Sequence, residues 1–181
     1  MVSVIAIDID PVKIAFAQHN AAIYGVADRI DFIVGDFMQL ADTLKGDVCF
    51  LSPPWGGPDY ALKESFSLRD MTIDGNAIFD KALQITANIV YFLPRNTDRS
   101  ELFALAAKTS TQWCQPTFSM LKNRCKALTT YYGALVETEG AEDEIEDMLH
   151  VTSPLVSMNG EEETVEEGQL EDDPYGHWGE E

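Results

Sequence analysis

The sequence has few cysteines and no segment that could lead it into or across a membrane. Cys49, Cys114 and Cys125 are odd in number, and neither a close cysteine pair nor a Cys/His cluster occurs. We interpret them as reduced, small apolar residues of an intracellular protein, without a disulfide or a metal site. The N-terminus lacks a basic segment followed by a long apolar run, and the longest apolar runs have the length of strands. We therefore expect neither a signal peptide nor a transmembrane span.

Basic residues are also unevenly distributed. The 181 residues carry a formal net charge of −19, but residues 1–135 hold 14 acidic and 12 basic side chains, whereas residues 136–181 hold 17 acidic and no basic ones. We predict two parts: a folded domain at 1–135 and an acidic disordered tail at 136–181, which could bind a basic protein partner. Because the predicted domain is close to neutral, any contact with a nucleic acid must be local.

Strand-like and helical patterns alternate over residues 1–135. We expect strands at 2–9, 30–34, 47–51 and 88–93, helices at 12–24, 76–86 and 99–108, a short helix or turn at 37–44, a long loop at 53–74, and antiparallel strands at 111–122 and 125–135. The first four strands lack polar/apolar alternation, which is typical of parallel strands covered on both faces. The pattern predicts an α/β, doubly wound sheet that ends in an antiparallel strand pair.

Acidic residues follow the first two predicted strands. Ligands of such sheets bind beyond the carboxyl ends of the strands, so Asp8 is placed to accept hydrogen bonds from the ribose of a nucleoside cofactor. Asp10 precedes Pro11 and is interpreted mainly as a helix cap. After the second strand, Asp36 could bind the amino group of adenine and Phe37 could cover its ring. The alternative is that Asp36 only forms a turn.

The third strand ends in Ser52-Pro53-Pro54-Trp55-Gly56-Gly57, which is the most specific pattern in the chain. The two prolines stiffen the backbone and remove two N–H donors, so that the nearby carbonyls are rigid acceptors. Acceptors next to a flat aromatic residue suit the binding of an exocyclic amino group of a base, with its lone pair directed at an electrophilic methyl group. Such catalysis relies on positioning. A Pro-Pro turn followed by a core tryptophan is the alternative.

Basic side chains follow the later strands. Arg95 comes directly after the fourth strand and could bind phosphate, or it could form a surface salt bridge. Lys122, Arg124 and Lys126 cluster in the predicted hairpin turn. We interpret them mainly as solubilising residues, with phosphate contact as the alternative.

Three segments of the chain closely resemble the trimethylguanosine synthase family, whose members are RNA cap guanine-N2 methyltransferases. They are Asp-Ile-Asp-Pro-Val-Lys-Ile-Ala at 8–15, Ser-Pro-Pro-Trp-Gly-Gly-Pro-Asp-Tyr at 52–60 and Asn-Ile-Val-Tyr-Phe-Leu-Pro-Arg-Asn at 88–96. The resemblance implies a class I methyltransferase (Rossmann-like) fold, S-adenosylmethionine as cofactor and 7-methylguanosine-capped small nuclear and nucleolar RNAs as substrates. It implies a nuclear location, in the nucleolus or Cajal bodies, with the cytoplasm as a further site.

The resemblance also implies roles for individual residues. Asp8 would bind the ribose of the cofactor, and Asp36 with Phe37 its adenine. Ser52, Pro53 and Pro54 would form the catalytic segment that holds the guanine 2-amino group. Trp55 would stack on the 7-methylguanine ring, and Arg95 would contact the cap phosphates.

The chain departs from the family at its start. In the family a first strand and a Gly-rich loop precede the segment that corresponds to Val4–Asp8, whereas here Met1 stands almost directly before it. We therefore expect an N-terminally truncated, incomplete sheet, with a gap between residues 2–8 and 47–51. Each buried unpaired backbone group there would cost about 1–3 kcal/mol. The chain would then be a fragment, an inactive paralogue, or a sheet in which a neighbouring strand closes the gap.

Three functions remain open from the sequence. The leading hypothesis is a methyltransferase that converts 7-methylguanosine caps to 2,2,7-trimethylguanosine, inactive in this truncated form if the cofactor site is incomplete. The second is a non-catalytic cap- or protein-binding module. The third is methylation of another exocyclic amine, such as that of adenine in RNA.

Overall fold

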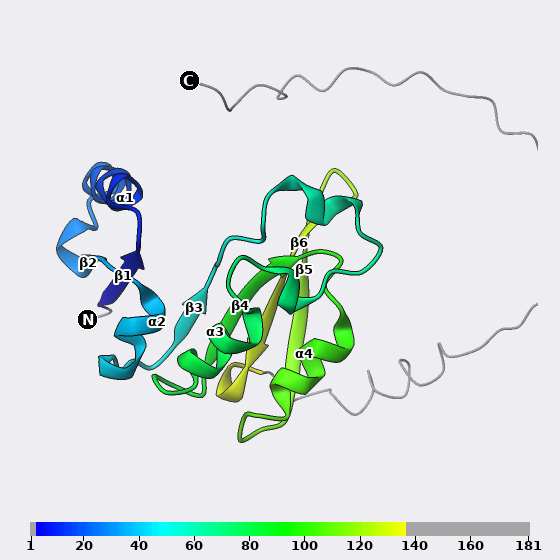
Figure 1. Cartoon of the computed structure of the whole chain (residues 1–181). Helices are drawn as coiled ribbons and strands as arrows, with labels where there is room; N and C mark the ends of the chain where they lie inside the picture. Colours follow the sequence, from blue (N-terminus) through cyan, green and yellow to red (C-terminus); the bar gives the residue numbers. More distant parts are fainter. Residues whose placement is uncertain (1–2, 137–181) are drawn as a thin grey trace, which may run out of the picture. The chain divides into compact units, whose positions relative to one another are not determined.

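The computed structural model of the chain describes residues 3–136, which fold as an α/β unit (Figure 1). The segment predicted to be an acidic tail lies outside the described residues from 137 onward. The strands are β1 (Val4–Asp8), β2 (Ile30–Val34), β3 (Cys49–Leu51), β4 (Ile89–Pro94), β5 (Cys114–Leu121) and β6 (Arg124–Tyr132), and the α-helices are α1 (Pro11–Ile23), α2 (Phe37–Leu40), α3 (Gly75–Ala82) and α4 (Arg99–Ala106). The predicted order of elements is confirmed, and the strand 30–34 has the predicted bounds.

The first sheet contains β1 and β2, which run parallel and are joined by α1. The predicted start of this helix is confirmed, because the Asp10 side chain accepts a hydrogen bond from the backbone N–H of Val12 (2.8 Å) and Pro11 occupies the first helical position. Gly25 follows the helix at φ 65°, a conformation that favours glycine. The β1–α1–β2 unit thus directs Asp8 and Asp36 to the same carboxyl edge.

The second sheet has the strand order β3-β4-β6-β5. Strand β4 pairs in parallel with β3 and antiparallel with β6, and β5 pairs antiparallel with β6. The predicted hairpin is confirmed. Its two turn residues, Lys122 and Asn123, have φ values of 47° and 60°, as a two-residue turn between twisted strands requires.

Helices α3 and α4 cover one face of the second sheet, and the core lies beneath them (Figure 1). The Phe79 ring of α3 stacks on Tyr91 of β4 (6.3 Å between centroids) and meets Tyr132 of β6 edge-on (4.8 Å). Helix α3 ends four residues earlier than predicted. Between this helix and β4, the Thr86 hydroxyl donates a hydrogen bond to the carbonyl of Asp47 (3.1 Å), a contact between distant segments that the helical pattern does not predict.

The two sheets are not paired with each other. Strands β1 and β3 are the facing outer strands, and among residues 3–136 no strand pairs with the free edge of either. The expected gap between residues 2–8 and 47–51 is therefore present in the described part, and the alternative in which a neighbouring strand closes it is wrong there. No helix among the described residues is long and apolar enough to cross a membrane.

The Phe79 ring should be a major source of stability, since it is fully buried between two tyrosines. We expect Phe79→Ala to lower the free energy of unfolding by about 3–5 kcal/mol, because it removes apolar contacts and leaves a cavity. Urea denaturation followed by circular dichroism measures this change. The matched control is Phe103→Ala on α4, where the side chain is 56% exposed and the expected change is within about 0.5 kcal/mol. Equal losses in both variants would contradict the proposed packing.

Candidate functional site

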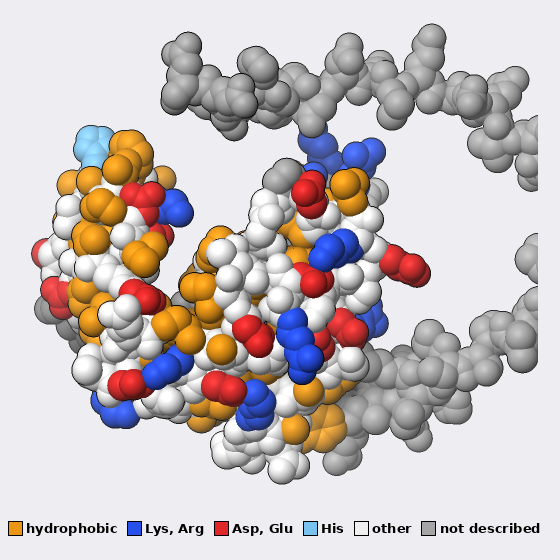
Figure 2. Space-filling model, in the orientation of Figure 1, with side chains coloured by type: hydrophobic (Ala, Val, Ile, Leu, Met, Phe, Trp, Pro, Cys, Tyr) orange, Lys and Arg blue, Asp and Glu red, His pale blue; other side chains and the backbone are white. Residues whose placement is uncertain are grey.

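A cavity of about 330 Å³ runs along the gap between β1 and β3, from Leu44 and Val48 before β3 to the carboxyl ends of both strands. Figure 2 shows hydrophobic side chains on both sides of the hollow between the first and the second sheet. Six of the predicted site residues line the cavity: Asp8, Asp36, Phe37, Ser52, Pro53 and Pro54. Trp55 and Arg95 do not line it. The structure therefore brings together the residues predicted to bind the cofactor and those predicted to bind the amino group. Trp55 and Arg95 lie elsewhere.

The two carboxylates of the cavity also order the backbone around them. Asp8 accepts a hydrogen bond from the N–H of Asp10 (2.9 Å) through one oxygen. Asp36 caps α2 by accepting from the N–H of Met38 (2.9 Å), and its second oxygen accepts from the Gln39 side chain (3.2 Å). Asp36 therefore does form a turn, which was the alternative to a role in binding adenine. This turn does not prevent ligand binding, because a carboxylate oxygen accepts more than one hydrogen bond.

The donor set fits the nucleoside half of S-adenosylmethionine. The second oxygen of Asp8 has no hydrogen-bond partner among residues 3–136, so it is available to ribose hydroxyls. Phe37, Ile7 and Ile9 supply apolar walls, and the volume is at the lower end of that of small-molecule sites. Within the described residues, no glycine-rich loop faces the cavity to hold the methionine half.

Ser52, Pro53 and Pro54 leave β3 without regular structure. Within the described part of the chain, neither the Ser52 hydroxyl nor the Pro53 and Pro54 carbonyls has a hydrogen-bond partner. Free acceptors on a backbone stiffened by two prolines are what the binding of an amino group requires. Gly56 and Gly57 follow at φ 92° and 93°, and this conformation lets the chain turn directly after the segment.

Trp55 belongs to an aromatic cluster on the second sheet. Its ring lies 5.3 Å from Phe92 and 5.1 Å from Tyr60, and its indole N–H donates weakly to the Phe92 carbonyl (3.4 Å). The side chain is half-buried. The alternative that Trp55 is a core residue is thus partly correct, because Phe92 and Tyr60 fix the orientation of its ring. The rest of the ring remains accessible for stacking, and a fixed ring loses little entropy on binding.

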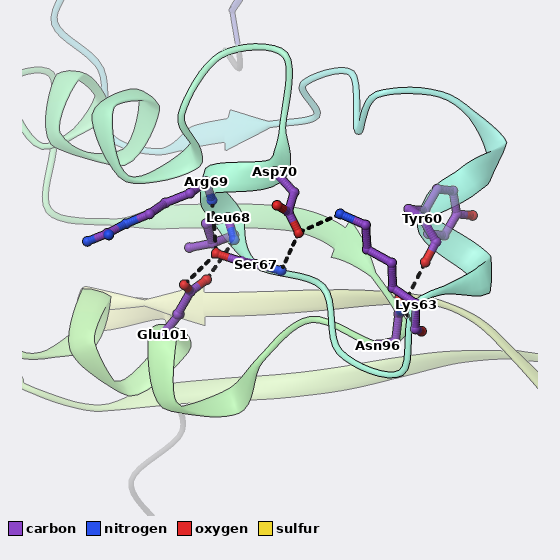
Figure 3. Close-up of polar contacts among 8 residues, drawn as sticks. All are labelled: Tyr60, Lys63, Ser67, Leu68, Arg69, Asp70, Asn96 and Glu101. Atoms are coloured by element: carbon purple, nitrogen blue, oxygen red, sulfur yellow. Dashed lines mark hydrogen bonds and ion pairs between the residues drawn. The ribbon is translucent and has the colours of Figure 1, made fainter.

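The loop after Trp55 is fastened to β4 and α4 by polar contacts (Figure 3). The Asn96 amide donates to the carbonyls of Tyr60 (2.9 Å) and Lys63 (2.8 Å). Glu101 of α4 accepts from the Ser67 hydroxyl (2.7 Å) and from the N–H of Leu68 (2.6 Å). We did not single out either residue from the sequence. No local pattern identifies Glu101, since its partners lie more than 30 positions away.

An ion pair and a capping box complete the loop. Lys63 pairs with Asp70 (2.8 Å), and hydrogen bonding to this lysine is the main cause that lowers the pKa of the Asp70 carboxyl. Ser67 and Asp70 cap each other's backbone around a 3₁₀ turn at Leu68–Asp70. The loop predicted at 53–74 holds two 3₁₀ segments, Pro58–Leu62 and Leu68–Asp70.

Arg95 lies in a second, smaller depression, which it lines together with Arg124, Cys125 and Lys126. Arg95 forms no ion pair with any described residue. The surface salt bridge, which was the alternative to phosphate binding, is therefore absent from this part of the chain.

Burial controls the chemistry of the one cysteine in the main cavity. It raises the pKa of the Cys49 thiol to about 11. The thiol is therefore protonated at neutral pH and is a poor nucleophile. No group of three His, Cys, Asp or Glu side chains able to hold a metal ion occurs in residues 3–136.

Asn96 should hold the loop in place, because one amide bridges two of its carbonyls. We expect Asn96→Ala to raise amide hydrogen exchange across residues 58–70 by about tenfold or more, since each lost hydrogen bond contributes about 1 kcal/mol. Exchange detected by mass spectrometry measures this. The control is Asn20→Ala on α1, an exposed side chain without a hydrogen bond in the described part of the chain. Unchanged exchange at 58–70 in Asn96→Ala would refute the role.

Comparison with known proteins points to one family. Residues 1–135 match the family model described as RNA cap guanine-N2 methyltransferase. The trimethylguanosine synthase of Schizosaccharomyces pombe is 38% identical over 136 residues, which are 71% of this chain and 56% of the relative. The Saccharomyces cerevisiae trimethylguanosine synthase is 34% identical over 90 residues, 46% of this chain and 29% of the relative.

The chain spans about half the length of the fission-yeast relative. A solved methyltransferase structure from Geobacter sulfurreducens is 16% identical, with a TM-score of 0.43, and the match covers 72% of this chain and 58% of that one. The family model covers three quarters of the chain and includes both strand-end segments that line the cavity. The chain belongs to the RNA cap guanine-N2 methyltransferase family, and the predicted incomplete Rossmann-like α/β fold is confirmed.

Proposed function

We propose that this chain carries the cofactor-adenosine and amino-acceptor sites of an enzyme that methylates the 2-amino group of 7-methylguanosine caps to give 2,2,7-trimethylguanosine. One observation supports this above the others. Asp8, Asp36 and Phe37 share a single cavity with the acceptor segment Ser52-Pro53-Pro54. A methyl donor and an amino acceptor must meet for transfer to occur, so residues suited to each should line the same space.

In this proposal the protein acts by positioning. S-adenosylmethionine supplies an electrophilic methyl group when it is bound. The Ser52 hydroxyl and the Pro53 carbonyl accept the two N–H bonds of the guanine 2-amino group and orient its lone pair. After transfer the nitrogen carries a surplus proton, which passes to water, since a positively charged nitrogen is a strong acid. No basic side chain is needed for that step.

Trp55 provides the preference for a methylated cap. A 7-methylguanine ring is cationic, and an indole face attracts a cation by about 1–2 kcal/mol when water is excluded. The contacts of the indole with Phe92 and Tyr60 hold its plane, so this attraction is not offset by a large loss of side-chain freedom. Arg95, three residues after Phe92 in the chain, is the residue that we assign to the cap phosphates.

Two further assignments extend this proposal from the family resemblance. The substrates would be capped small nuclear and nucleolar RNAs, and the site of action would be the nucleus, in the nucleolus or Cajal bodies, or the cytoplasm.

A non-catalytic cap-binding module is the second candidate. It is favoured by one observation: Trp55, to which the cap base is assigned, does not line the cavity assigned to the cofactor, so cap binding does not require the cofactor. Calorimetric titration with S-adenosylmethionine and with a cap analogue separates the candidates. Binding of the cap analogue without the cofactor would favour the module.

Replacement of Trp55 should remove the preference for a methylated cap. We expect the chain to bind 7-methylguanosine triphosphate about 5- to 30-fold more tightly than guanosine triphosphate, as 1–2 kcal/mol of cation–π attraction implies. Trp55→Ala should bind both nucleotides equally, and Trp55→Phe should retain part of the difference. Titration calorimetry gives both affinities.

Trp113→Ala is the control for this experiment, because its side chain is 51% exposed and does not line the cavity. A preference that survives in Trp55→Ala would show that Trp55 does not stack on the cap base. A tighter affinity for adenosine nucleotides than for 7-methylguanosine triphosphate would support adenine as the acceptor instead.

Transfer itself is tested with labelled S-adenosylmethionine and 7-methylguanosine-capped RNA, followed by nuclease digestion and chromatography of the cap. We expect 2,2,7-trimethylguanosine as the product. Ser52→Ala should lower the turnover by about tenfold, as the loss of one hydrogen bond to a developing charge implies. Undiminished turnover in Ser52→Ala would remove this residue from the mechanism, and absence of labelled product despite binding of both ligands would overturn the enzymatic proposal.

A further inference from the structure

The tip of the β5–β6 hairpin carries an unneutralised positive charge beside Arg95. Four of the twelve basic residues of the chain meet at this end of the second sheet: Arg95, Lys122, Arg124 and Lys126. The three ion pairs of the described residues use Lys63, Lys81 and Lys108 instead. All four side chains are exposed, and none has a carboxylate partner within residues 3–136. Figure 2 shows basic side chains gathered at the end of this hairpin.

Strand register explains why these charges converge. Strand β4 runs antiparallel to β6, and its last pair is Pro94 with Ala127. Arg95 follows β4 directly, so it lies beside the start of β6. Lys126 is an extra residue in a bulge of the hairpin, because Ser119 pairs with Ala127 and Met120 pairs with Cys125, and Arg124 is two residues away. Arg95, Arg124 and Lys126 together line a depression of about 370 Å³.

An exposed aromatic side chain also lies on this hairpin. Phe118 of β5 pairs with Leu128, which is two residues along β6 from Lys126. Its ring is 44% exposed, and the Arg99 guanidinium lies over it at 5.8 Å from the ring centroid. Cations beside an exposed aromatic ring are the combination that binds single-stranded nucleic acid, since the cations contact phosphates and the ring stacks on a base.

The hairpin tip and the acceptor segment lie at the same edge of the sheet. Strands β3 and β4 are parallel, so Ser52 follows β3 at the edge where Arg95 follows β4. The hairpin turn reaches that edge because β6 runs in the opposite direction. Trp55 contacts Phe92, and Arg95 follows three residues later, in the turn directly after β4. A chain that leaves a base held at Trp55 would pass Arg95 and then meet Arg124 and Lys126.

We propose that the hairpin residues Arg124 and Lys126, with Lys122 in the turn, bind the phosphate backbone of the RNA that follows the cap. The inference rests on the proposed function for the identity of the RNA, but the binding itself does not require a cap. It assigns to these residues a role beyond the solubility that we first inferred from the sequence.

The test uses the 181-residue chain and a short, uncapped, fluorescently labelled single-stranded RNA, with anisotropy measured over a range of salt concentrations. We expect affinity to fall as salt rises, with a slope of log K against log salt of about −0.7 for each phosphate contacted. Arg124→Ala with Lys126→Ala should reduce the magnitude of the slope by about 1.4 for two lost contacts. Affinity should fall by about tenfold or more, as the loss of charged hydrogen bonds implies.

The control removes two other exposed cations, Lys13→Ala with Arg29→Ala, and changes the net charge equally. An unchanged slope in the hairpin variant would overturn the proposal, and so would an equal reduction in the control. An acidic peptide of the same charge that displaces the RNA completely at equal concentration would overturn it in favour of a protein ligand.

Trp55→Ala separates this proposal from the proposed function. It should abolish the preference for 7-methylguanosine and leave the binding of uncapped RNA unchanged. Retained RNA binding in a chain without any cap preference would contradict the cap assignment alone. Cap preference with no binding of uncapped RNA would contradict the hairpin assignment alone.

Discussion

The rest of the described structure depends on strand β4. It is paired on both sides, in parallel with β3 and antiparallel with β6, and Ile89, Tyr91 and Leu93 are fully buried. A strand with neighbours on both sides and helices over one face satisfies its backbone hydrogen bonds and buries its apolar side chains at once. The position of β4 determines which residues meet at its carboxyl end. Phe92 packs against Trp55, Asn96 fastens the loop, and Arg95 faces the hairpin.

The gap between the two sheets is the main departure from a complete fold. The free edges of β1 and β3 flank a cavity with apolar walls, and large apolar side chains are exposed on both strands, among them Ile5 and Phe50. Unpaired backbone edges and exposed apolar surface are costly together, because each is a site for association with another chain. The same gap holds the predicted site residues from both sheets.

Much of the site was predictable, because the carboxyl ends of parallel strands meet at one edge. Asp8, Asp36 and Ser52 each follow an apolar run, so their shared position in the cavity follows from the alternation of strands and helices. The contacts of Trp55 and the role of Asn96 were not predictable. They depend on the path of the loop after Gly57, which no local periodicity describes.

The clustering of positive charge at the hairpin was also only partly predictable from the sequence. The sequence predicts its two strands and the turn at Asn123, and it places Lys122, Arg124 and Lys126 close together along the chain. It does not place them beside Arg95, which lies about thirty positions earlier, and this meeting decides whether the cations only aid solubility or form a binding surface.

The sequence by itself determined the order of elements, the helix caps and the proline-stiffened segment after β3, because these depend on neighbouring residues and on local backbone preferences. Tertiary structure alone decided that Trp55 and Arg95 lie outside the cavity that the residues predicted to bind the cofactor and the amino group share. It also decided that four cations converge at one sheet edge. Such meetings depend on strand pairing and register between distant segments, and long-range pairing is set by the packing of the whole domain.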